Sequence, residues 1–356
     1  MKYYILFFIA LSYTTSIYSQ IIYYDAAQFP LIGKISNLTE TRYERLPADL
    51  KDICRSPVWN LGKNSSGLAV RFRSNSTSIS AKWEVLSNIQ MNHMTDTGIK
   101  GLDLYAWQSD HWQFVNSGRP SDKLNDKIII QNMNPIEREY LLFLPLYDGL
   151  VTLSIGVDST AYIDQPKLNL IRTNNPIIVY GTSITQGGCA SRPGMSYTNI
   201  LSRKLNMEII NLGFSGNGKL DYEIAELMSK RHDAALFVLD FIPNVTSDQI
   251  KERTANFVSI LRKENPKTPI LFIETVFFPH AFFDYTTKNI INEKNIVLRN
   301  EFDKLKKAGN KNIYYLEGKN LIGNDMEATV DGVHFTDLGF NRMAIILQRK
   351  IEKILK

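Results

Sequence analysis

The chain has 356 residues, a hydrophobic share of 44% and a formal net charge of +5. This length allows one large or two ordinary domains, and the hydrophobic share is that of a globular protein with a sizeable core. The excess positive charge is dispersed, apart from a basic C-terminal end that we interpret as a solvated helix face. The sequence has no dense Lys/Arg run with interleaved aromatics and therefore favours no nucleic-acid partner.

The first 19 residues have the pattern of a secretory signal peptide. Lys2 gives a positive start, an apolar core covers residues 5–11, and small polar residues follow as far as residue 19. Such a segment is too short to span a bilayer. We predict export of a chain that begins near residue 20; the alternative is a buried first strand. No other segment is long and apolar enough for us to expect a membrane span.

Residues 20–171 mostly alternate between apolar and polar positions. In SGLAVRFRSNSTSISAKWEV, the apolar Leu68, Val70 and Phe72 alternate with other residues, and the alternation resumes at 79–85 after a Ser/Asn/Thr turn. This pattern predicts a β-hairpin with one solvent-facing side. Further short apolar runs follow, separated by Gly, Pro, Asn or Asp, without a long helix. We predict an all-β sandwich of the jelly-roll kind.

Residues 172–356 have a different texture. RTNNP at 172–176 is typical of a linker. Apolar runs then alternate with helical stretches: PIIVY and SYTNILSRKL, EIINL and YEIAELMSK, AALFVLD and SDQIKERTANFVSILRK. PILFIETVF and NIYYLEG supply two more strands, and a last helix begins at Thr336. This alternation predicts an α/β domain with a parallel sheet and helices on both faces, whose site lies at the carboxyl ends of the strands.

The stretch GTSITQGG, at 181–188, ends the first of these strands in small polar residues. It is a phosphate-binding loop, a tight turn, or a turn that presents Ser183 as a nucleophile. A P-loop requires a Lys after its glycines and a dinucleotide loop requires G-x-G-x-x-G, and both are absent. The elbow G-x-S-x-G is also absent, because Thr185 stands where its second Gly belongs. The nucleophile and the plain turn remain, and a nucleophilic Ser needs a base.

His334 is the best candidate for that base. It lies in DGVHFTDLGF, three residues after Asp331 and just before the last helix. There Asp331 can orient one ring nitrogen while the other faces Ser183, as in a Ser-His-Asp triad. The alternative is that Asp331 and Asp337 only form a turn and cap a helix. We expect the other four histidines at surfaces, at interfaces or in a pocket wall: His93, His111, His232 and His280.

Two loops after the next strands offer donors for an oxyanion. NLGFSGNG follows the second strand and is rich in residues that leave backbone N–H groups free, and DFIPN follows the third and offers the Asn244 amide. Either loop alone is a common turn. The chain has two cysteines, Cys54 and Cys189, far apart in sequence, and we expect two free thiols, with a disulfide as the alternative. No residue near Cys189 in the sequence would activate it as a rival nucleophile.

With these blocks, the chain resembles the SGNH (GDSL-type) hydrolases over residues 172–356. GTSITQGG is similar to their first block, NLGFSGNG to the second and DGVH to the fifth, while DFIPN takes the place of the third. The resemblance implies a flavodoxin-like domain with Ser183 as nucleophile and Asp331 and His334 completing a triad. It implies an oxyanion hole formed by the N–H groups of Ser183 and Gly216 and the amide of Asn244. No metal or other cofactor is implied.

The chain departs from the family pattern in two blocks. Thr182 replaces the acid of GDSIT, and D-x-x-P-N, which contains Asn244, replaces G-x-N-D. These changes resemble a subgroup of secreted bacterial esterases whose N-terminal β-domain carries G-x-D-L-Y, here residues 101–105. The subgroup resembles secreted bacterial carbohydrate esterases. Expected export, the lack of a lid-like apolar segment and the additional β-sandwich favour a short acyl group, acetyl above all, on an oligosaccharide or polysaccharide. Because the N-terminal β-domain also fits this subgroup, the resemblance covers nearly the whole mature chain.

Other functions remain open. A long-chain lipase or acyl-thioesterase is the alternative among enzymes, and a non-catalytic glycan-binding protein is the alternative outside them. Aromatic side chains of the β-rich part either stack on sugar rings or belong to the core of the sandwich: Tyr105, Trp107 and Trp112. The sequence selects no particular sugar and no oligomeric state.

Overall fold

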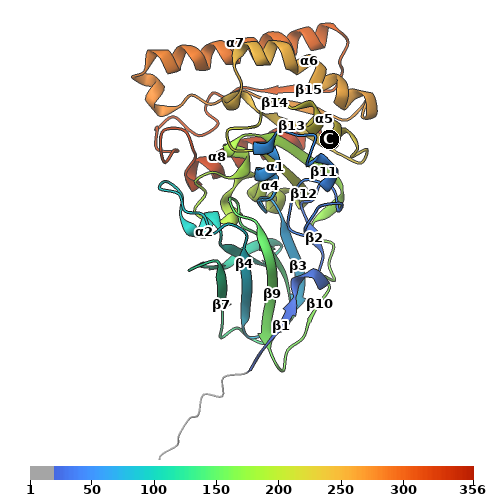
Figure 1. The fold of residues 1–356 in the computed structure, drawn as a ribbon, viewed down its shortest axis with the longest axis vertical. Helices are drawn as coiled ribbons and strands as arrows, with labels where there is room; N and C mark the ends of the chain where they lie inside the picture. Colours follow the sequence, from blue (N-terminus) through green and yellow to red (C-terminus); the bar gives the residue numbers. More distant parts are fainter. Residues whose placement is uncertain (1–19) are drawn as a thin grey trace, which may run out of the picture.

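The structure, a computed structural model, describes residues 20–356. The expected signal peptide, 1–19, lies outside the described residues, so export stays a prediction. The molecule has two parts (Figure 1). A β-rich part, coloured mainly blue to green in Figure 1, lies below a part in which helices surround a sheet. The second part contains the C-terminal half of the chain. Within residues 20–356, no helix has the length and apolar character needed to cross a membrane.

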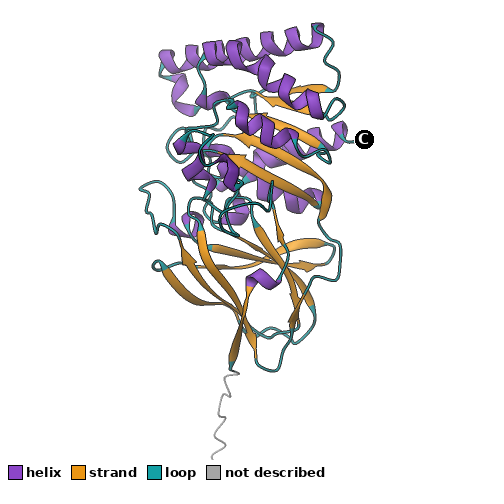
Figure 2. Ribbon diagram, turned by 45° about the vertical axis from the view of Figure 1, so that its right-hand side comes forward, coloured by secondary structure: helices purple, strands orange, loops and turns teal. Residues whose placement is uncertain are grey.

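The β-rich part contains two antiparallel sheets that face each other (Figure 2). One sheet has the strand order β1 (Ile21–Asp25), β9 (Leu150–Asp158), β4 (Ile79–Val85) and β7 (Leu124–Ile130). The other has the order β10 (Ile163–Asp164), β3 (Ala69–Ser74), β8 (Arg138–Phe143), β5 (Leu102–Gln108) and β6 (His111–Gly118), with β2 (Leu31–Ile32) also paired to β3. Buried side chains from both sheets form one cluster, which confirms the predicted sandwich.

The predicted hairpin between β3 and β4 is wrong. These strands belong to different sheets, and the turn between them carries the chain across the sandwich. The carboxylate of Asp158 fixes this turn by accepting hydrogen bonds from the backbone N–H groups of Thr77 and Ser78 at 2.8 and 3.1 Å. The alternation correctly predicts which residues face the core, but it does not select a pairing partner. The outer face of β3 is also covered, because Arg71 there is only 6% exposed.

The C-terminal part contains a five-stranded parallel sheet. Its strand order is β12 (Met207–Gly213), β11 (Arg172–Gly181), β13 (Leu236–Asp240), β14 (Ile270–Ile273) and β15 (Ile313–Leu316). The chain runs from β11 to β12 on one side and then returns to β13 on the other. This order is flavodoxin-like, and it creates a switch point at the carboxyl end of β11, where such sheets bind ligands.

Helices cover both faces of this sheet, as predicted. One face packs against α5 (Tyr222–Ser229), α6 (Ser247–Glu264) and α7 (Tyr285–Lys307), and the other against α4 (Tyr197–Leu205) and α8 (Asp337–Ile354). The β-rich part contributes to the first face through α1 (Ser56–Gly62), whose Val58 and Trp59 join the same core cluster. A short helix, α2 (Asp96–Ile99), also belongs to the β-rich part.

The predicted linker at residues 172–176 is part of β11. Arg172 pairs with Met207, and the register shifts before regular pairing resumes at Ile177. Pro and Asn lower the intrinsic strand preference of this stretch, but its ends are held by the backbone of neighbouring segments: the N–H of Arg172 donates to Asn206 and the carbonyl of Pro176 accepts from Ala235. The division into domains 20–171 and 172–356 stays a prediction.

A buried arginine joins the two parts. Arg45, 1% exposed, donates from Nη1 to the carbonyl oxygens of Asn211 and Gly213 at 3.0 and 2.8 Å, at the end of β12. It also donates from Nε to Asn64 at 2.9 Å and from Nη2 to Leu61 at 2.7 Å. Burial lowers the pKa of Arg45 to about 9. Four carbonyl groups thus take the place of the water around this guanidinium.

Arg45→Met is expected to lower the free energy of unfolding by about 2–4 kcal/mol, because it leaves these buried carbonyl oxygens without donors. Urea unfolding monitored by circular dichroism measures this change. The control is Arg119→Met, at an exposed position, where the change should stay within about 0.5 kcal/mol. Equal stability of the two variants would contradict the role assigned to Arg45.

Candidate active site

Ser183 begins a short helix directly after β11. This helix, α3 (Ser183–Gln186), is capped by Thr182, whose side chain accepts a hydrogen bond from the N–H of Ile184 at 3.3 Å. The helix ends at Gly187, whose φ of 106° lies in the left-handed region that favours glycine. An acidic residue at this helix cap would accept the same hydrogen bond as Thr182. The replacement of the acid of GDSIT by Thr182 therefore preserves the cap.

Ser183, His334 and Asp331 form a continuous chain of hydrogen bonds. Ser183 Oγ lies 2.9 Å from His334 Nε2, and His334 Nδ1 lies 2.7 Å from Asp331 Oδ2. The other carboxylate oxygen, Oδ1, accepts the backbone N–H groups of Val333 and His334 at 3.0 and 2.8 Å. Ser183 is 8% exposed. In this geometry Nδ1–H donates to the carboxylate, and the lone pair of Nε2 faces the serine hydroxyl.

The environment of Asp331 favours its ionised form. Burial raises the pKa of the carboxyl group, but the hydrogen bonds from the His334 ring and from two backbone N–H groups outweigh it and lower the pKa to about 2. The carboxylate therefore stays charged over the whole neutral and mildly acidic range. Its negative charge is available to stabilise a protonated His334.

Asp331→Asn is expected to reduce kcat about 10⁴-fold, because the amide no longer holds the His334 tautomer. The stability difference between wild type and this variant should depend on pH. The pKa of Asp331 is lower in the folded protein than the value of about 3.9 in the unfolded chain, so the ionised carboxylate stabilises the fold at pH values above about 3.9. This stabilisation is lost as the pH falls toward about 2. Ester hydrolysis and urea midpoints at pH 7 and pH 2.5 measure both effects.

The control for this variant is Asp52→Asn, at an exposed position. It should change neither kcat nor the pH dependence of the urea midpoint. A stability gap between wild type and Asp331→Asn that stays constant from pH 7 to pH 2.5 would contradict the low pKa of Asp331.

The loops after β12 and β13 meet the serine loop at the same edge of the sheet. Gly216 has a φ of 66° and is exposed, and a Cβ added there would meet nothing within 4 Å, so its backbone borders open space. The side chain of Gln186, in the turn of the serine, accepts the N–H of Ser215 at 3.0 Å. Asn244 accepts the N–H of Gly218 through Oδ1 at 3.2 Å, which leaves its Nδ2 as the free donor. The three predicted oxyanion groups thus lie on adjoining, cross-linked loops.

Asn244→Ala is expected to reduce kcat about 10²–10³-fold, the usual cost of losing one oxyanion donor. Asn256→Ala, at an exposed position of α6, is the matched control and should leave kcat unchanged. Steady-state hydrolysis of a nitrophenyl ester measures both variants. A kcat for Asn244→Ala within threefold of the wild type would remove this residue from the oxyanion hole.

The β-rich part reaches this site through His93, which we expected at a surface or an interface, and through Tyr147, which no sequence motif indicated. The ring centroid of His93 lies 5.6 Å from that of His334. The hydroxyl of Tyr147 donates to the carbonyl oxygen of Ser183 at 3.2 Å. His93 lies in a polar loop without regular periodicity, so no signal in the sequence distinguishes it from a surface histidine.

Asp103, the acid of G-x-D-L-Y, anchors the loop that follows the serine turn. The buried carboxylate accepts the N–H of Gly194 at 2.8 Å, the guanidinium of Arg192 at 2.7 Å and the hydroxyl of Ser117 at 2.6 Å. Burial raises the pKa of Asp103 even though Arg192 opposes the shift. The motif therefore joins β5 to the C-terminal part.

The remaining histidines and Asp337 lie outside the hydrogen-bond chain of Ser183, His334 and Asp331. His111 and His232 are exposed, as expected. His280 lies beside Gly332, in the loop of Asp331, where a Cβ on the glycine would come within 2.9 Å of His280 Nδ1. Asp337 accepts the N–H of Ser191 at 3.0 Å, whereas the last helix is capped by Thr336.

Cys54 and Cys189 are both buried and unpaired, as expected. Burial raises the pKa of the Cys189 thiol to about 12. The thiolate that a cysteine nucleophile requires is therefore disfavoured at neutral pH, and Cys189 is no rival to Ser183.

Aromatic side chains of the β-rich part are mainly packed. Tyr105 and Trp112 are 3% and 7% exposed and share a buried cluster with Phe143, while Trp107 packs partly buried against that cluster. Tyr105 and Trp112 also line a cavity of about 450 Å³ between the two parts. Most of their ring surface is engaged with protein.

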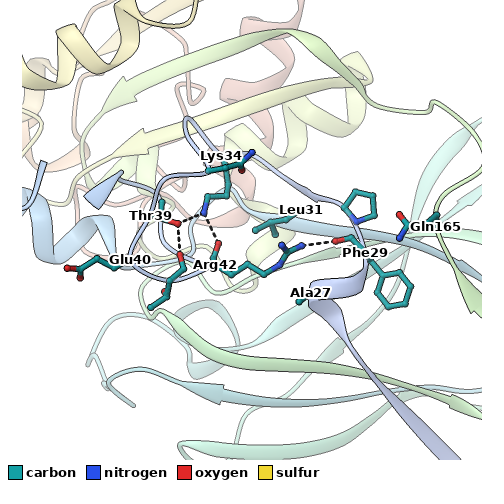
Figure 3. A pocket seen from close by; sticks show the side chains of 11 residues that line it. Ala27, Phe29, Leu31, Lys34, Thr39, Glu40, Arg42 and Gln165 are labelled. Atoms are coloured by element: carbon teal, nitrogen blue, oxygen red, sulfur yellow. Dashed lines mark hydrogen bonds between the residues drawn. The ribbon is translucent and has the colours of Figure 1, made fainter. Parts of the chain in front are cut away.

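Two other cavities lie apart from the serine. One of about 580 Å³ is lined by residues of the β-rich part, where Lys34 donates to Thr39 and to the carbonyl of Arg42 (Figure 3). Another of about 360 Å³ has a mostly apolar lining that includes Phe277 and Phe282. Neither cavity, nor that of 450 Å³, has Ser183, His334 or Asn244 in its lining.

A flavodoxin-like sheet with Ser183, His334 and Asp331 in hydrogen-bond contact at its carboxyl edge is the arrangement expected of an SGNH-type hydrolase. Residues 174–352 match the GDSL-like lipase/acylhydrolase family, and residues 21–163 match the GxDLY model for the N-terminus of SGNH-hydrolase-type esterases. A solved structure of a Bacteroides ovatus protein assigned as a GDSL-like lipase is 39% identical, with a TM-score of 0.90, and covers 94% of this chain and 98% of its own. The chain belongs to the GDSL-like lipase/acylhydrolase family.

More distant structures share the fold of both parts. A salicylyl-acyltransferase from a tetracycline biosynthetic pathway is 17% identical, with a TM-score of 0.76, and covers 95% of this chain and 98% of its own. An acetyl xylan esterase from Butyrivibrio proteoclasticus is 11% identical, with a TM-score of 0.58, and covers 94% and 98%. Among curated proteins, none matches the chain. At these identities the likeness concerns the fold.

Proposed function

We propose that this protein is an exported bacterial serine esterase that removes short acyl groups, acetyl above all, from an oligosaccharide or polysaccharide. The observation that carries the proposal is the hydrogen-bond chain from Ser183 through His334 to Asp331. A serine hydroxyl becomes a nucleophile when a positioned base accepts its proton, and this chain supplies the base and the group that orients it.

The reaction proceeds in two steps. Ser183 Oγ attacks the ester carbonyl while His334 Nε2 accepts the hydroxyl proton, and the tetrahedral oxyanion is held by the N–H groups of Ser183 and Gly216 and the Nδ2 of Asn244. His334 then donates its proton to the departing sugar hydroxyl, leaving an acyl-serine. Water, deprotonated by His334, releases the acid and restores the serine. No step requires a metal or a cofactor.

The surroundings of the serine support a short acyl group. His93, Cys189 and Tyr147 crowd the side of the site that faces the β-rich part. A carbohydrate substrate is supported by the shared two-part fold of the acetyl xylan esterase, and the expected signal peptide supports export.

Acetate release from a panel of acetylated plant and bacterial glycans tests the proposal, together with nitrophenyl esters of two to twelve carbons. We expect acetate release and a preference for the two-carbon ester. Ser183→Ala should lose at least about 10⁴-fold in kcat, because removing a triad member leaves only the oxyanion hole and binding. Ser259→Ala, at an exposed position of α6, is the matched control and should behave as the wild type.

Other results would identify another function. A preference for eight carbons or more, without acetate release from glycans, would indicate a lipase. Glycan binding without hydrolysis of any ester would indicate a binding protein. Full activity of Ser183→Ala would overturn the proposed mechanism.

A further inference from the structure

Four potential metal ligands meet beside the catalytic serine. One donor atom from each of His93, Cys189, Asp331 and His334 lies within 4.8 Å of the donor atoms of the other three. The four side chains come from three separate segments: the loop before α2, the turn after α3 and the loop before α8. We propose that this cluster binds a zinc-like divalent cation and that the bound cation reversibly inhibits the esterase. The inhibition rests on the proposed function, whereas the binding does not.

The donor set selects the type of cation. Two imidazoles, a thiolate and a carboxylate are ligands of Zn²⁺, whereas Mg²⁺ and Ca²⁺ prefer oxygen ligands alone. In a tetrahedral zinc site with bonds of 2.0–2.3 Å, the donor atoms lie about 3.3–3.8 Å apart. The separations in the protein are at most 4.8 Å, so a pair at that limit has to shorten by about 1.0–1.5 Å when the cation binds.

Both histidines of the cluster have an oxygen atom beside Nδ1. His93 Nδ1 lies 2.8 Å from the side-chain oxygen of Asn92, and His334 Nδ1 lies 2.7 Å from Asp331 Oδ2. An imidazole that donates Nδ1–H to an oxygen keeps the lone pair of Nε2 for a metal, which is the usual arrangement around metal-bound histidines. Asn92 would thus orient His93, whereas a cation held by both Asp331 and His334 would take the place of the proton between Oδ2 and Nδ1.

The charges of the cluster balance. Cys189 loses its proton to solvent when its S–H bond is replaced by a bond from sulfur to the metal. The thiolate and the Asp331 carboxylate then supply two negative charges against the two positive charges of the cation, and both imidazoles are neutral. Cys189 is only 7% exposed, so a site without net charge is favoured there.

A cation bound to His334 stops catalysis, whichever of the two ring nitrogens it binds. A metal on Nε2 occupies the lone pair that accepts the proton of Ser183. A metal on Nδ1, bound also by Asp331, leaves the ring proton on Nε2, which then has no lone pair for the proton of Ser183. The cation is therefore an inhibitor and not a cofactor of the reaction. Because His93 belongs to the β-rich part, the cation also links the two parts of the protein.

The first experiment measures binding without any enzymatic activity. The full-length Ser183→Ala protein is titrated with Co²⁺, which substitutes for Zn²⁺ and gives a thiolate-to-cobalt absorption band when a cysteine binds it. We expect the band to appear with one equivalent of Co²⁺ and to disappear when Zn²⁺ displaces it. The band should be absent when Cys189→Ser is added and retained when Cys54→Ser is added, because Cys54 is the other buried thiol and lies outside the cluster.

The second experiment measures inhibition of the wild-type protein. Zn²⁺ should inhibit ester hydrolysis, a chelator should restore it, and Mg²⁺ at the same concentration should have no effect. His93→Ala and Cys189→Ser should each raise the Zn²⁺ concentration for half-inhibition at least 10-fold, relative to the metal-free activity of the same variant. His93→Ala, at a partly exposed loop position, provides the test if Cys189→Ser does not fold.

The outcomes separate the two proposals. A cobalt band in Ser183→Ala together with a wild-type protein that hydrolyses no ester would retain the metal site and reject the esterase. Ester hydrolysis by the wild type without a cobalt band in Ser183→Ala, or a band lost in Cys54→Ser and kept in Cys189→Ser, would overturn the metal site. Equal inhibition of the wild type and His93→Ala would do so as well.

Discussion

The hydrogen bonds that converge on the carboxylate of Asp331 are the constraint on which the site depends. One oxygen accepts two backbone N–H groups and so closes its own loop, while the other orients the ring of His334. The N–H of Val330 also donates to the carbonyl of His334 at 2.8 Å, which fixes the two ends of the loop to each other. These hydrogen bonds join the loop to itself without any contribution from substrate. The helix that follows the loop, α8, packs against α4, and His334 reaches Ser183 at the switch point of the sheet.

The β-rich part acts as a structural component of the site and not as an appended module. Arg45 supports the end of β12, just before the loop of Gly216. Asp103 anchors the loop after the serine turn, and Tyr147 contacts the serine backbone itself. Each of these side chains satisfies groups in the C-terminal part that would otherwise be buried without partners or exposed to water. The shape of the site is therefore determined by both parts together.

The sequence predicts the site better than it predicts the β-rich part. Ser183, Gly216 and Asn244 each follow a strand of a parallel sheet, and this topology alone brings their loops together, so the proximity of these loops could be predicted from short motifs. The pairing of β3 and β4 was predicted wrongly, because an alternating pattern defines a face but not a partner. Residues 172–176 were predicted as a linker from composition, although backbone contacts make them part of a strand. His93 reaches the site only through tertiary contacts of an irregular loop, which leave no trace in local patterns.

The pairing of segments that lie far apart in the sequence affects how this protein folds during synthesis. β1 pairs with β9, so Ile21 finds its partner Asp158 only after more than a hundred further residues have been made. The delay is longer for Arg45, because its partners, the carbonyl groups of Asn211 and Gly213, are synthesised later still. At ordinary rates of translation this delay is on the order of ten seconds. Throughout it, the first strands expose unpaired edges, and a chain of this topology depends on chaperones, or on crossing a membrane unfolded, more than one built from local hairpins.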